Sequence, residues 1–153
     1  LPNVNSRPAK LFCAYYAQDD PKKNTAVKLK KHGLLTVRPN VKRCPRSAIV
    51  LDPFSHEVLS PEDKERIERS GLVVVDCSWN QIDKVFKKPF EYGRTLPPLL
   101  AANSINYGKW NRLSSAEALA AALFIVGRKN QAKKLLSKFK WGKEFWKLNK
   151  GNF

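Results

Sequence analysis

One stretch decides the fold: Leu72-Val73-Val74-Val75-Asp76-Cys77-Ser78-Trp79. Its first five residues predict a buried strand that ends on an acid, and Ser78 predicts the N-cap of a helix with Trp79 in its first turn. In α/β proteins, ligands bind where strands end and helices begin, because backbone N–H groups converge there. A carboxylate and an indole at that edge suit a flat, positively charged ligand that bears adenine. An ordinary capped turn with a core tryptophan has the same pattern.

Short strands and helices alternate on both sides of this stretch, in the order expected of an α/β sheet. Apolar runs predict three further strands, at 10–16, 34–37 and 48–51. Capping residues predict three helices: 26–31 with Thr25 as its N-cap, 61–70 with Ser60 as its N-cap, and 79–86.

The segment from Pro89 to Trp110 is different, because prolines and glycines interrupt it and only Leu99–Ala102 resembles a strand. About twenty irregular residues in a compact domain usually serve a function. After this segment, Ser114-Ser115-Ala116-Glu117 predicts a capping box that begins an Ala-rich helix over 116–126. Two basic helices, at about 130–138 and 141–148, are expected to complete the fold.

The composition indicates a folded protein with a polyanionic partner. Its 153 residues suffice for one large domain or two small lobes that share a core, and 42% of them are hydrophobic. There are 29 Lys and Arg residues against 13 Asp and Glu, a formal net charge of +16. An excess of this size favours RNA or DNA as the partner ahead of a membrane surface.

The positive charge is concentrated at the two ends of the chain. Residues 1–46 hold 11 basic and 2 acidic groups, and residues 128–153 hold 9 and 1. Residues 47–127 are almost neutral, with 9 basic and 10 acidic groups. This pattern predicts a central part that carries the chemistry, between two ends that bind a polyanion.

Several classes of function lack their motifs. The three cysteines are far apart and pair with no histidine, so no metal site is expected and a reducing cytosol fits. No apolar run approaches the roughly 20 residues of a membrane span. No GxGxxG, P-loop, HExxH or GxSxG motif is present. His32 and His56 are expected at the surface, so a hydrolase triad is poorly supported.

Seven segments, in this order along the chain, resemble one family. The family is the S-adenosylmethionine-dependent aminocarboxypropyltransferases of small-subunit ribosomal RNA, and the chain is similar to its archaeal members. The matching segments are Asp20–Thr25, Leu51–Pro53, Val75–Trp79, Arg94–Asn103, Asn106–Gly108, Leu113–Ala118 and Phe139–Phe145. Each is weak alone, but their order and spacing cover nearly the whole chain. One departure is Ser104, where the family pattern has proline.

The resemblance implies an α/β fold like that of the SPOUT methyltransferases, with a trefoil knot near the C-terminus. An N-terminal α/β lobe would cover residues 1–95, and a knotted helical lobe would cover 96–153. Periodicity could not predict a knot, since true knots are rare. The resemblance also implies a cytoplasmic monomer that acts late in ribosome biogenesis.

The implied reaction transfers a 3-amino-3-carboxypropyl group from S-adenosylmethionine to N3 of a modified pseudouridine in a small-subunit rRNA hairpin loop. Methylthioadenosine is then the leaving group. The methyl group must be buried and the side-chain carbon next to sulfur exposed. By resemblance, Trp79 packs on the cofactor and covers the methyl group. A plain core role for Trp79 is the alternative.

The resemblance also implies the other cofactor contacts. Thr25 would contact the amino-acid end of the cofactor, although it could serve only as a helix cap. The adenine and ribose would be lined by side chains or held by backbone groups of the following residues: Leu51, Pro53, Val75, Leu99, Tyr107, Leu113 and Ala118. Of these, the three leucines belong to the core on either interpretation.

Asp76 is the candidate for the polar role in the reaction. The N3–H group of the base is weakly acidic, so a carboxylate within hydrogen-bond reach could take or orient its proton. Asp76 could equally hold the ammonium group of the cofactor, and the sequence does not choose between these roles. Most of the rate should come from holding the nucleophile and the carbon in line.

RNA contacts are expected from the two basic ends of the chain. The candidates are Lys22, Lys23, Lys28, Lys30, Lys31, Arg38, Lys42, Arg43, Arg46, Lys133, Lys134 and Lys138. Arg94 is either an ion-pair partner that structures its loop or a phosphate contact. Binding should weaken steeply with salt, and a base in a hairpin loop can be turned out easily. A methyltransferase of the same knotted class and a non-enzymatic RNA-binding assembly factor are the alternative functions.

Overall fold

Five parallel strands form one sheet within residues 7–16 and 24–153, the part of the chain that the computed structural model describes. The strands are β1 (Leu11–Tyr15), β2 (Thr36–Arg38), β3 (Ile49–Leu51), β4 (Leu72–Asp76) and β5 (Gly93–Arg94). They lie in the order β2-β1-β4-β3-β5, and β4 pairs with β1 over all five residues. The stretch that begins at Leu72 therefore forms the central strand of an α/β sheet, as its sequence predicts.

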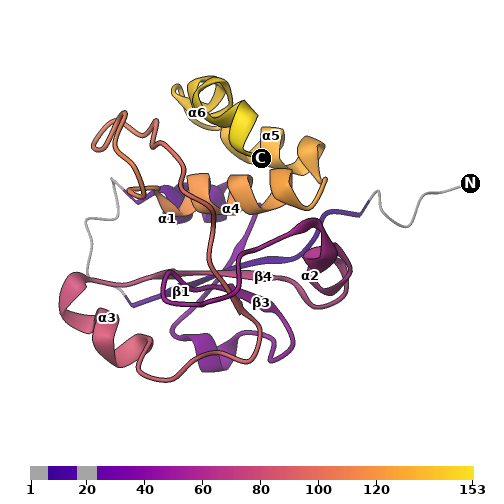
Figure 1. Ribbon diagram of the computed structural model, residues 1–153, viewed down its shortest axis with the longest axis vertical. Helices are drawn as coiled ribbons and strands as arrows, with labels where there is room; N and C mark the ends of the chain where they lie inside the picture. The colour runs from indigo at the N-terminus through magenta and orange to yellow at the C-terminus, as the bar shows by residue number, and fades with distance from the viewer. Residues whose placement is uncertain (1–6, 17–23) are drawn as a thin grey trace, which may run out of the picture.

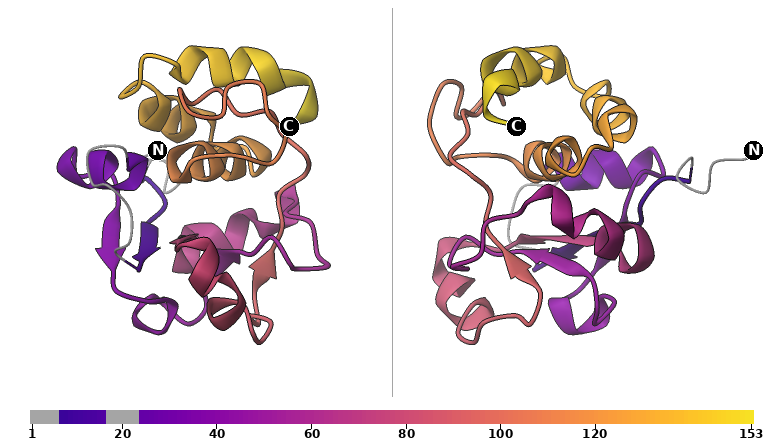
Figure 2. Two further views of the ribbon diagram at one scale, coloured as in Figure 1. Left: turned by 90° about the vertical axis from the view of Figure 1, so that its left-hand side faces the viewer. Right: turned by 45° about the vertical axis from the view of Figure 1, so that its right-hand side comes forward.

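Six α-helices surround the sheet in the described residues. They are α1 (Thr25–Lys31), α2 (Lys64–Ser70), α3 (Trp79–Val85), α4 (Ser115–Ile125), α5 (Lys129–Leu136) and α6 (Gly142–Asn149). Single 3-10 turns lie at η2 (Val41–Arg43), η3 (Pro61–Asp63) and η4 (Lys150–Asn152). Helices α1 and α4 lie side by side over one face of the sheet (Figure 1). Helices α5 and α6 lie outside α4, farther from the sheet (Figure 2).

Alternate residues of the strands face two separate cores, because side chains alternate along a strand. On one face, Leu72 and Val74 join the large core that α1, α2, α4, α5 and α6 cover. On the other face, Val73 packs with Val41 of η2 and with Phe90. The face of the sheet that α1 and α4 cover thus carries the larger core, and we call it the thick face. The opposite face carries the smaller core, and we call it the thin face.

Helix α4 is the centre of the helical layer. Its residues from Ala116 to Phe124 are buried apart from Ala118, as expected of a helix that is apolar all round. The predicted capping box is confirmed: the Ser114 hydroxyl accepts from the backbone N–H of Glu117 at 3.3 Å, and the Glu117 carboxylate accepts from the backbone N–H of Ser114 at 2.9 Å.

The predicted N-cap of α1 is wrong by one residue. Asn24, not Thr25, caps the helix, and its side-chain oxygen accepts from the backbone N–H groups of Ala26 and Val27 at 2.8 and 3.1 Å. The Thr25 hydroxyl instead accepts from the backbone N–H of Ala116 at the start of α4, 3.0 Å away. The Thr25 hydroxyl, which the local sequence pattern predicts to cap α1, thus makes a tertiary contact with α4 instead.

The strand predicted at Leu99–Ala102 does not form. Only Leu100 makes a bridge, to Trp110, and the Asn149 side chain of α6 binds both backbone groups of Leu100. The fifth strand is β5, which has only two residues and no apolar alternation. It forms because backbone hydrogen bonds join this segment to β3 and the residue after it. One of them runs from the Asp52 N–H to the Arg94 carbonyl, at 2.8 Å. Ser78 stands at the N-cap of α3, but its hydroxyl makes no capping bond.

Candidate active site

The site lies where β1 and β4 end, because the chain leaves these two neighbouring strands toward opposite faces of the sheet. Helix α1 follows β1 on the thick face, and α3 follows β4 on the other side (Figure 1). In parallel α/β sheets, such a switch point opens a crevice at the carboxyl ends of the strands. Two cavities occupy this region of the described structure, and both are lined by Val75 and Cys77.

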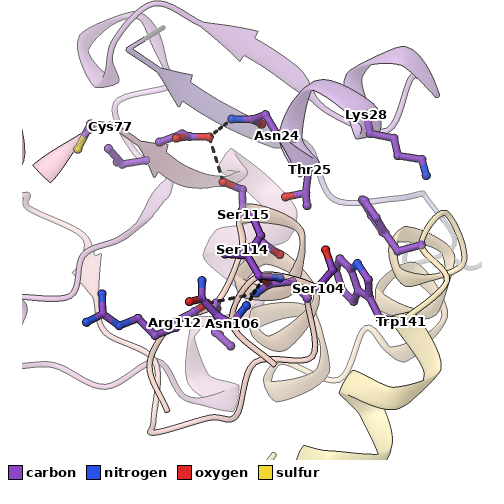
Figure 3. Close-up of a pocket in the computed structure, with 16 residues that line it drawn as sticks. Asn24, Thr25, Lys28, Cys77, Ser104, Asn106, Arg112, Ser114, Ser115 and Trp141 are labelled. Carbon is purple, nitrogen blue, oxygen red and sulfur yellow. Dashed lines mark hydrogen bonds between the residues drawn. The ribbon is translucent and has the colours of Figure 1, made fainter. Parts of the chain in front are cut away.

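The larger cavity has a volume of about 930 Å³, and both polar and apolar side chains line it. Figure 3 shows side chains from the start of α1, the end of β4, the loop around Ser104, the start of α4 and the connection before α6 that holds Trp141. Lys28 and Arg112 bring positive charge to its lining. The cavity is therefore suited to a polar or anionic ligand.

Asp76 is held by side chains from two different helices. The Asn24 amide donates to one carboxylate oxygen of Asp76 at 2.6 Å, and the Ser115 hydroxyl donates to the same oxygen at 3.5 Å (Figure 3). The oxygen of the Asn24 amide is already used as the cap of α1, so only its N–H groups face Asp76. The carboxylate is thereby fixed in one orientation at the end of the central strand.

The start of α4 forms the boundary between the two cavities. Leu113, Ser114 and Ser115 line both of them. The free N–H groups in the first turn of a helix carry partial positive charge. The Thr25 hydroxyl binds the N–H of Ala116, and this contact joins α1 to the same boundary. A ligand that spans the two cavities would pass over this helix end.

Glu117 is fully buried and connects this boundary to the irregular segment before it. One of its oxygens accepts from the backbone N–H groups of Ala102 and Asn103 at 2.6 and 3.1 Å. The other accepts from the Asn103 amide at 2.6 Å and from the Ser114 hydroxyl at 2.9 Å. A buried carboxylate needs such donors, and here it fixes the loop that lines the larger cavity.

Two contacts from α6 hold the same loop from outside. The Asn149 amide exchanges two hydrogen bonds with the backbone of Leu100, at 2.7 and 2.8 Å. The Tyr107 hydroxyl donates to Glu144 at 3.1 Å, and this hydrogen bond raises the pKa of Tyr107. The loop from Leu99 to Asn111 is thus anchored on both sides although it contains no strand.

The smaller cavity, of about 440 Å³, is lined mainly by apolar side chains. Leu51 and Pro53 come from the end of β3, and Ala118 comes from α4. A proline-containing segment, Leu96–Pro98, closes another side. Small-molecule sites commonly have this size and an apolar lining with a few polar groups.

An aromatic pair forms one wall of the larger cavity. The rings of Phe139 and Trp141 stack with centroids 4.7 Å apart and an interplanar angle of 22°. The Lys28 ammonium lies 5.0 Å from the centroid of the Phe139 ring. We refer to Phe139 and Trp141 as the aromatic wall.

Most of the residues predicted to contact a cofactor lie around the two cavities. Thr25 and Asp76 line the larger one, Leu51, Pro53 and Ala118 line the smaller one, and Val75 and Leu113 line both. Two others line neither cavity: Leu99 is fully buried, and Tyr107 is 57% exposed. The side chain of Trp79 lies outside the described part of the chain.

The residues predicted to bind RNA are spread over two faces. Lys28 lines the larger cavity, and Lys30, Lys31, Lys133, Lys134 and Lys138 belong to the helical side. Lys42 and Arg43 belong to η2 on the thin face, with Arg38 and Arg46 close to them in the chain. Lys22 and Lys23 lie outside the described residues. Arg94 is an ion-pair partner that structures its loop, since its guanidinium binds Asp63 at 3.2 Å with 15% of its side chain exposed.

No site role was predicted from the sequence for eleven residues that line the larger cavity: Asn24, Cys77, Asn103, Ser104, Ile105, Asn106, Arg112, Ser114, Ser115, Phe139 and Trp141. All of them except Ser104, Ile105 and Arg112 lie in segments that match the family, and that match was the available signal. In the described residues, no group of three His, Cys, Asp or Glu side chains could hold a metal ion. No helix in the same part of the chain is long and apolar enough to cross a membrane.

A parallel sheet with two adjoining cavities at its switch point defines the class as an α/β protein with room for a ligand at the ends of its strands. The family model described as "Ribosome biogenesis protein, C-terminal" matches residues 49–153. The 16S rRNA aminocarboxypropyltransferase of Methanosarcina acetivorans is 44% identical over 151 residues, which cover 96% of this chain and 84% of that protein. The enzyme of the same name from Methanocaldococcus jannaschii is 43% identical over 92% of this chain and 82% of its own length.

A solved structure agrees with these matches. The SAM-dependent rRNA:acp-transferase Tsr3 from Vulcanisaeta distributa superimposes with a TM-score of 0.87 and 40% identity, over 94% of this chain and 79% of that chain. The chain therefore belongs to the family of ribosome biogenesis proteins that contains the archaeal 16S rRNA aminocarboxypropyltransferases.

Proposed function

We propose that this protein is an S-adenosylmethionine-dependent enzyme that transfers the 3-amino-3-carboxypropyl group to N3 of a pseudouridine or methylpseudouridine in small-subunit rRNA. The observation that carries the proposal is the pair of adjoining cavities that share Val75, Leu113 and Ser115. A group transfer between a small molecule and a large RNA needs two sites that meet at the reacting atoms. The names of the relatives support the cofactor and the substrate.

The residues of the smaller cavity fit the adenosine part of S-adenosylmethionine. Leu51, Pro53 and Ala118 supply an apolar lining for adenine and ribose. Backbone hydrogen bonds from Val75 and Leu99 rest on the family resemblance alone. When bound, S-adenosylmethionine supplies an electrophilic carbon next to its sulfonium. Trp79 covers the methyl group, a role that rests on the family resemblance, as does the adenine contact of Tyr107.

The boundary between the cavities fits the amino-acid end of the cofactor. Asp76 holds the ammonium group, since its carboxylate is fixed there by Asn24 and Ser115. The N-terminus of α4 favours the carboxylate group through the positive end of the helix dipole, while the N–H groups of Ala116 and Glu117 are bound by Thr25 and Ser114. Thr25 contributes its hydroxyl next to this helix end.

The protein contributes to the reaction mainly by position. The base enters the larger cavity, where its N3 can approach the shared boundary from the side opposite the adenosine site. With S-adenosylmethionine bound there, N3 would bond to carbon as the carbon–sulfur bond breaks, so that methylthioadenosine would leave and the N3 proton would pass to water. Alignment of the reacting atoms can supply about 7–11 kcal/mol of the barrier reduction in such reactions.

We also propose the finer features of the fold and of the assembly. Residues 1–95 and 96–153 act as two lobes with one shared core, and the second lobe contains a SPOUT-like trefoil knot. The loop held between Glu117 and Asn149 is the segment that would thread the knot. The enzyme acts as a monomer in the cytoplasm, because one chain supplies both cavities and its three cysteines are free thiols.

The basic ends of the chain bind the RNA around the larger cavity. Of these candidates, Lys28 lines the larger cavity. The other lysines of α1 and α5 and the basic residues of η2 would contact RNA that extends beyond it. Lys22 and Lys23 precede α1 directly in the chain. Contacts of this kind supply most of the affinity for RNA and little of the selectivity.

Two labelled forms of S-adenosylmethionine test the proposed function. One carries label in the methyl group and the other in the carboxyl group, and each is incubated with protein and small-subunit rRNA. We expect label from the carboxyl group alone to enter the RNA. Label from the methyl group alone would indicate a methyltransferase, and a folded protein that binds no cofactor in calorimetry would indicate an assembly factor.

Trp79→Ala tests the covering of the methyl group. We expect it to weaken cofactor binding about tenfold in calorimetry while the circular dichroism spectrum keeps its shape, because stacking on an indole contributes on the order of 1 kcal/mol or more. Unchanged affinity would remove Trp79 from the site.

A further inference from the structure

The aromatic wall lies in the short connection between α5 and α6. Lys28 approaches the Phe139 ring from α1. Gly142 makes this arrangement possible: a Cβ atom there would lie 2.0 Å from the carbonyl oxygen of Leu136. The backbone can therefore turn tightly between the two helices only with glycine at this position.

The two rings of the wall are partly buried rather than enclosed, and both line the larger cavity. Phe145 of the same layer is fully buried. Phe139 and Trp141 are partly buried and pack against the core on one side. On the other side they line the cavity, where Figure 3 shows Trp141.

We propose that the aromatic wall stacks against the RNA base that receives the transferred group, with Trp141 as the contacting ring. This inference rests on the proposed function and adds a substrate subsite to it. Bases that are turned out of a hairpin loop are commonly held by stacking on aromatic side chains. The Lys28 ammonium lies over the Phe139 ring, 5.0 Å from its centroid, and Trp141 stacks on the same ring.

The position of the aromatic wall indicates that the base stacked on it is the base that reacts. The larger cavity meets the proposed cofactor cavity at Val75, Leu113 and Ser115, and only the reacting base must reach that boundary. Lys28 and Arg112 also line the cavity and supply positive charge for phosphates on either side of the base. Asn106 and Ser104 supply polar groups that can contact the base edges.

Steady-state kinetics with matched variants test the subsite. For Trp141→Ala, we expect the KM for RNA to rise about tenfold, since stacking contributes roughly 1–3 kcal/mol per base. The calorimetric affinity for S-adenosylmethionine should change less than twofold. Trp141→Phe should restore most of the loss, because it keeps an aromatic face.

Trp110→Ala is the control, since Trp110 is 55% exposed and lines neither cavity. It should leave the KM for RNA unchanged. A Trp141→Ala variant with wild-type KM for RNA, or one that loses cofactor affinity to the same degree as RNA affinity, would overturn the proposal.

A crosslinking experiment tests the subsite without the need for catalysis. A small-subunit rRNA hairpin with 5-bromouridine at the target position is irradiated with the wild-type protein, and the adduct is mapped by mass spectrometry. We expect the adduct at Trp141 or Phe139. An adduct confined to any other segment would overturn the subsite. Failure of wild-type protein to transfer label would overturn the proposed function instead, and the crosslink would still report where the base lies.

Discussion

The two cavities differ in what holds their walls in place. The smaller one is built from strand ends and prolines, such as Leu51, Pro53 and Pro97, whose backbone positions are set by the sheet or by fixed φ angles. The larger one is built from a loop, two helix starts and the aromatic wall, and buried polar side chains hold these parts together.

Under the proposed function, the two kinds of wall suit different ligands. The ends of strands form a mainly apolar cavity for the adenosine part of the cofactor. Long-range contacts between segments form the wider cavity with cationic groups for RNA. Removal of such contacts should therefore affect the two cavities unequally.

The largest effect is expected for Glu117→Leu. It leaves the buried N–H groups of Ala102 and Asn103 without an acceptor, and each such group costs about 1–3 kcal/mol. We expect the free energy of unfolding, measured by denaturant titration, to fall by about 4 kcal/mol. Glu117→Gln keeps the shape and should lose about half as much.

In the folded Glu117→Gln variant, the KM for RNA should rise more than the Kd for the cofactor. The reason is that Glu117 holds Ala102 and Asn103 in the loop at the larger cavity, whereas its bond to Ser114 reaches a residue that lines both cavities. An equal rise in the KM for RNA and in the Kd for the cofactor would show that Glu117 supports both cavities to the same degree.

A smaller effect is expected for Asp76→Asn. If Asp76 holds the ammonium group of the cofactor, loss of a charged hydrogen bond of about 1.5–3 kcal/mol should weaken cofactor binding at least tenfold. Asp83→Asn, on the exposed side of α3, is the control and should bind normally. Normal cofactor affinity with a reduced kcat for Asp76→Asn would assign its carboxylate to the N3 proton instead.

The smallest effect is a loss of stability at high pH. Burial raises the pKa of the Cys13 thiol, and the nearby Asp76 charge raises it further, above the ordinary value of 9.0. Above pH 9 the unfolded chain therefore loses this proton while the folded protein keeps it. The stabilisation is complete below pH 9 and is lost as the pH rises, by up to about 1.4 kcal/mol per pH unit.

Denaturant titrations between pH 7 and 10.5 measure this slope. Cys13→Ala should be less stable at pH 7, since it leaves a small cavity, but its stability should decline less between pH 9 and 10.5. Burial also raises the pKa of Cys44, so part of the slope should remain in the variant. An unchanged slope in Cys13→Ala would remove Cys13 as its source.

The local patterns of the sequence were sufficient for much of the fold. The run from Leu72 to Asp76 is a buried strand in the structure, and the capping box at Ser114 and Glu117 begins α4 as expected. These features depend on residues within one turn or one strand. The activity was predicted from the resemblance to a known family, whose relatives carry it in their names. The periodicity of apolar residues predicts strands and helices but not a reaction.

The sequence by itself determined the strand that ends on Asp76, the Ala-rich helix that carries Glu117, and the excess of positive charge at both ends. Only the tertiary structure decided which side chains meet. Asn24 binds Asp76 across 52 residues of sequence, and Thr25 binds Ala116 across 91. The physical reason is that a hydroxyl or amide has several local partners of similar energy, and the packing of α1 against α4 selects one of them.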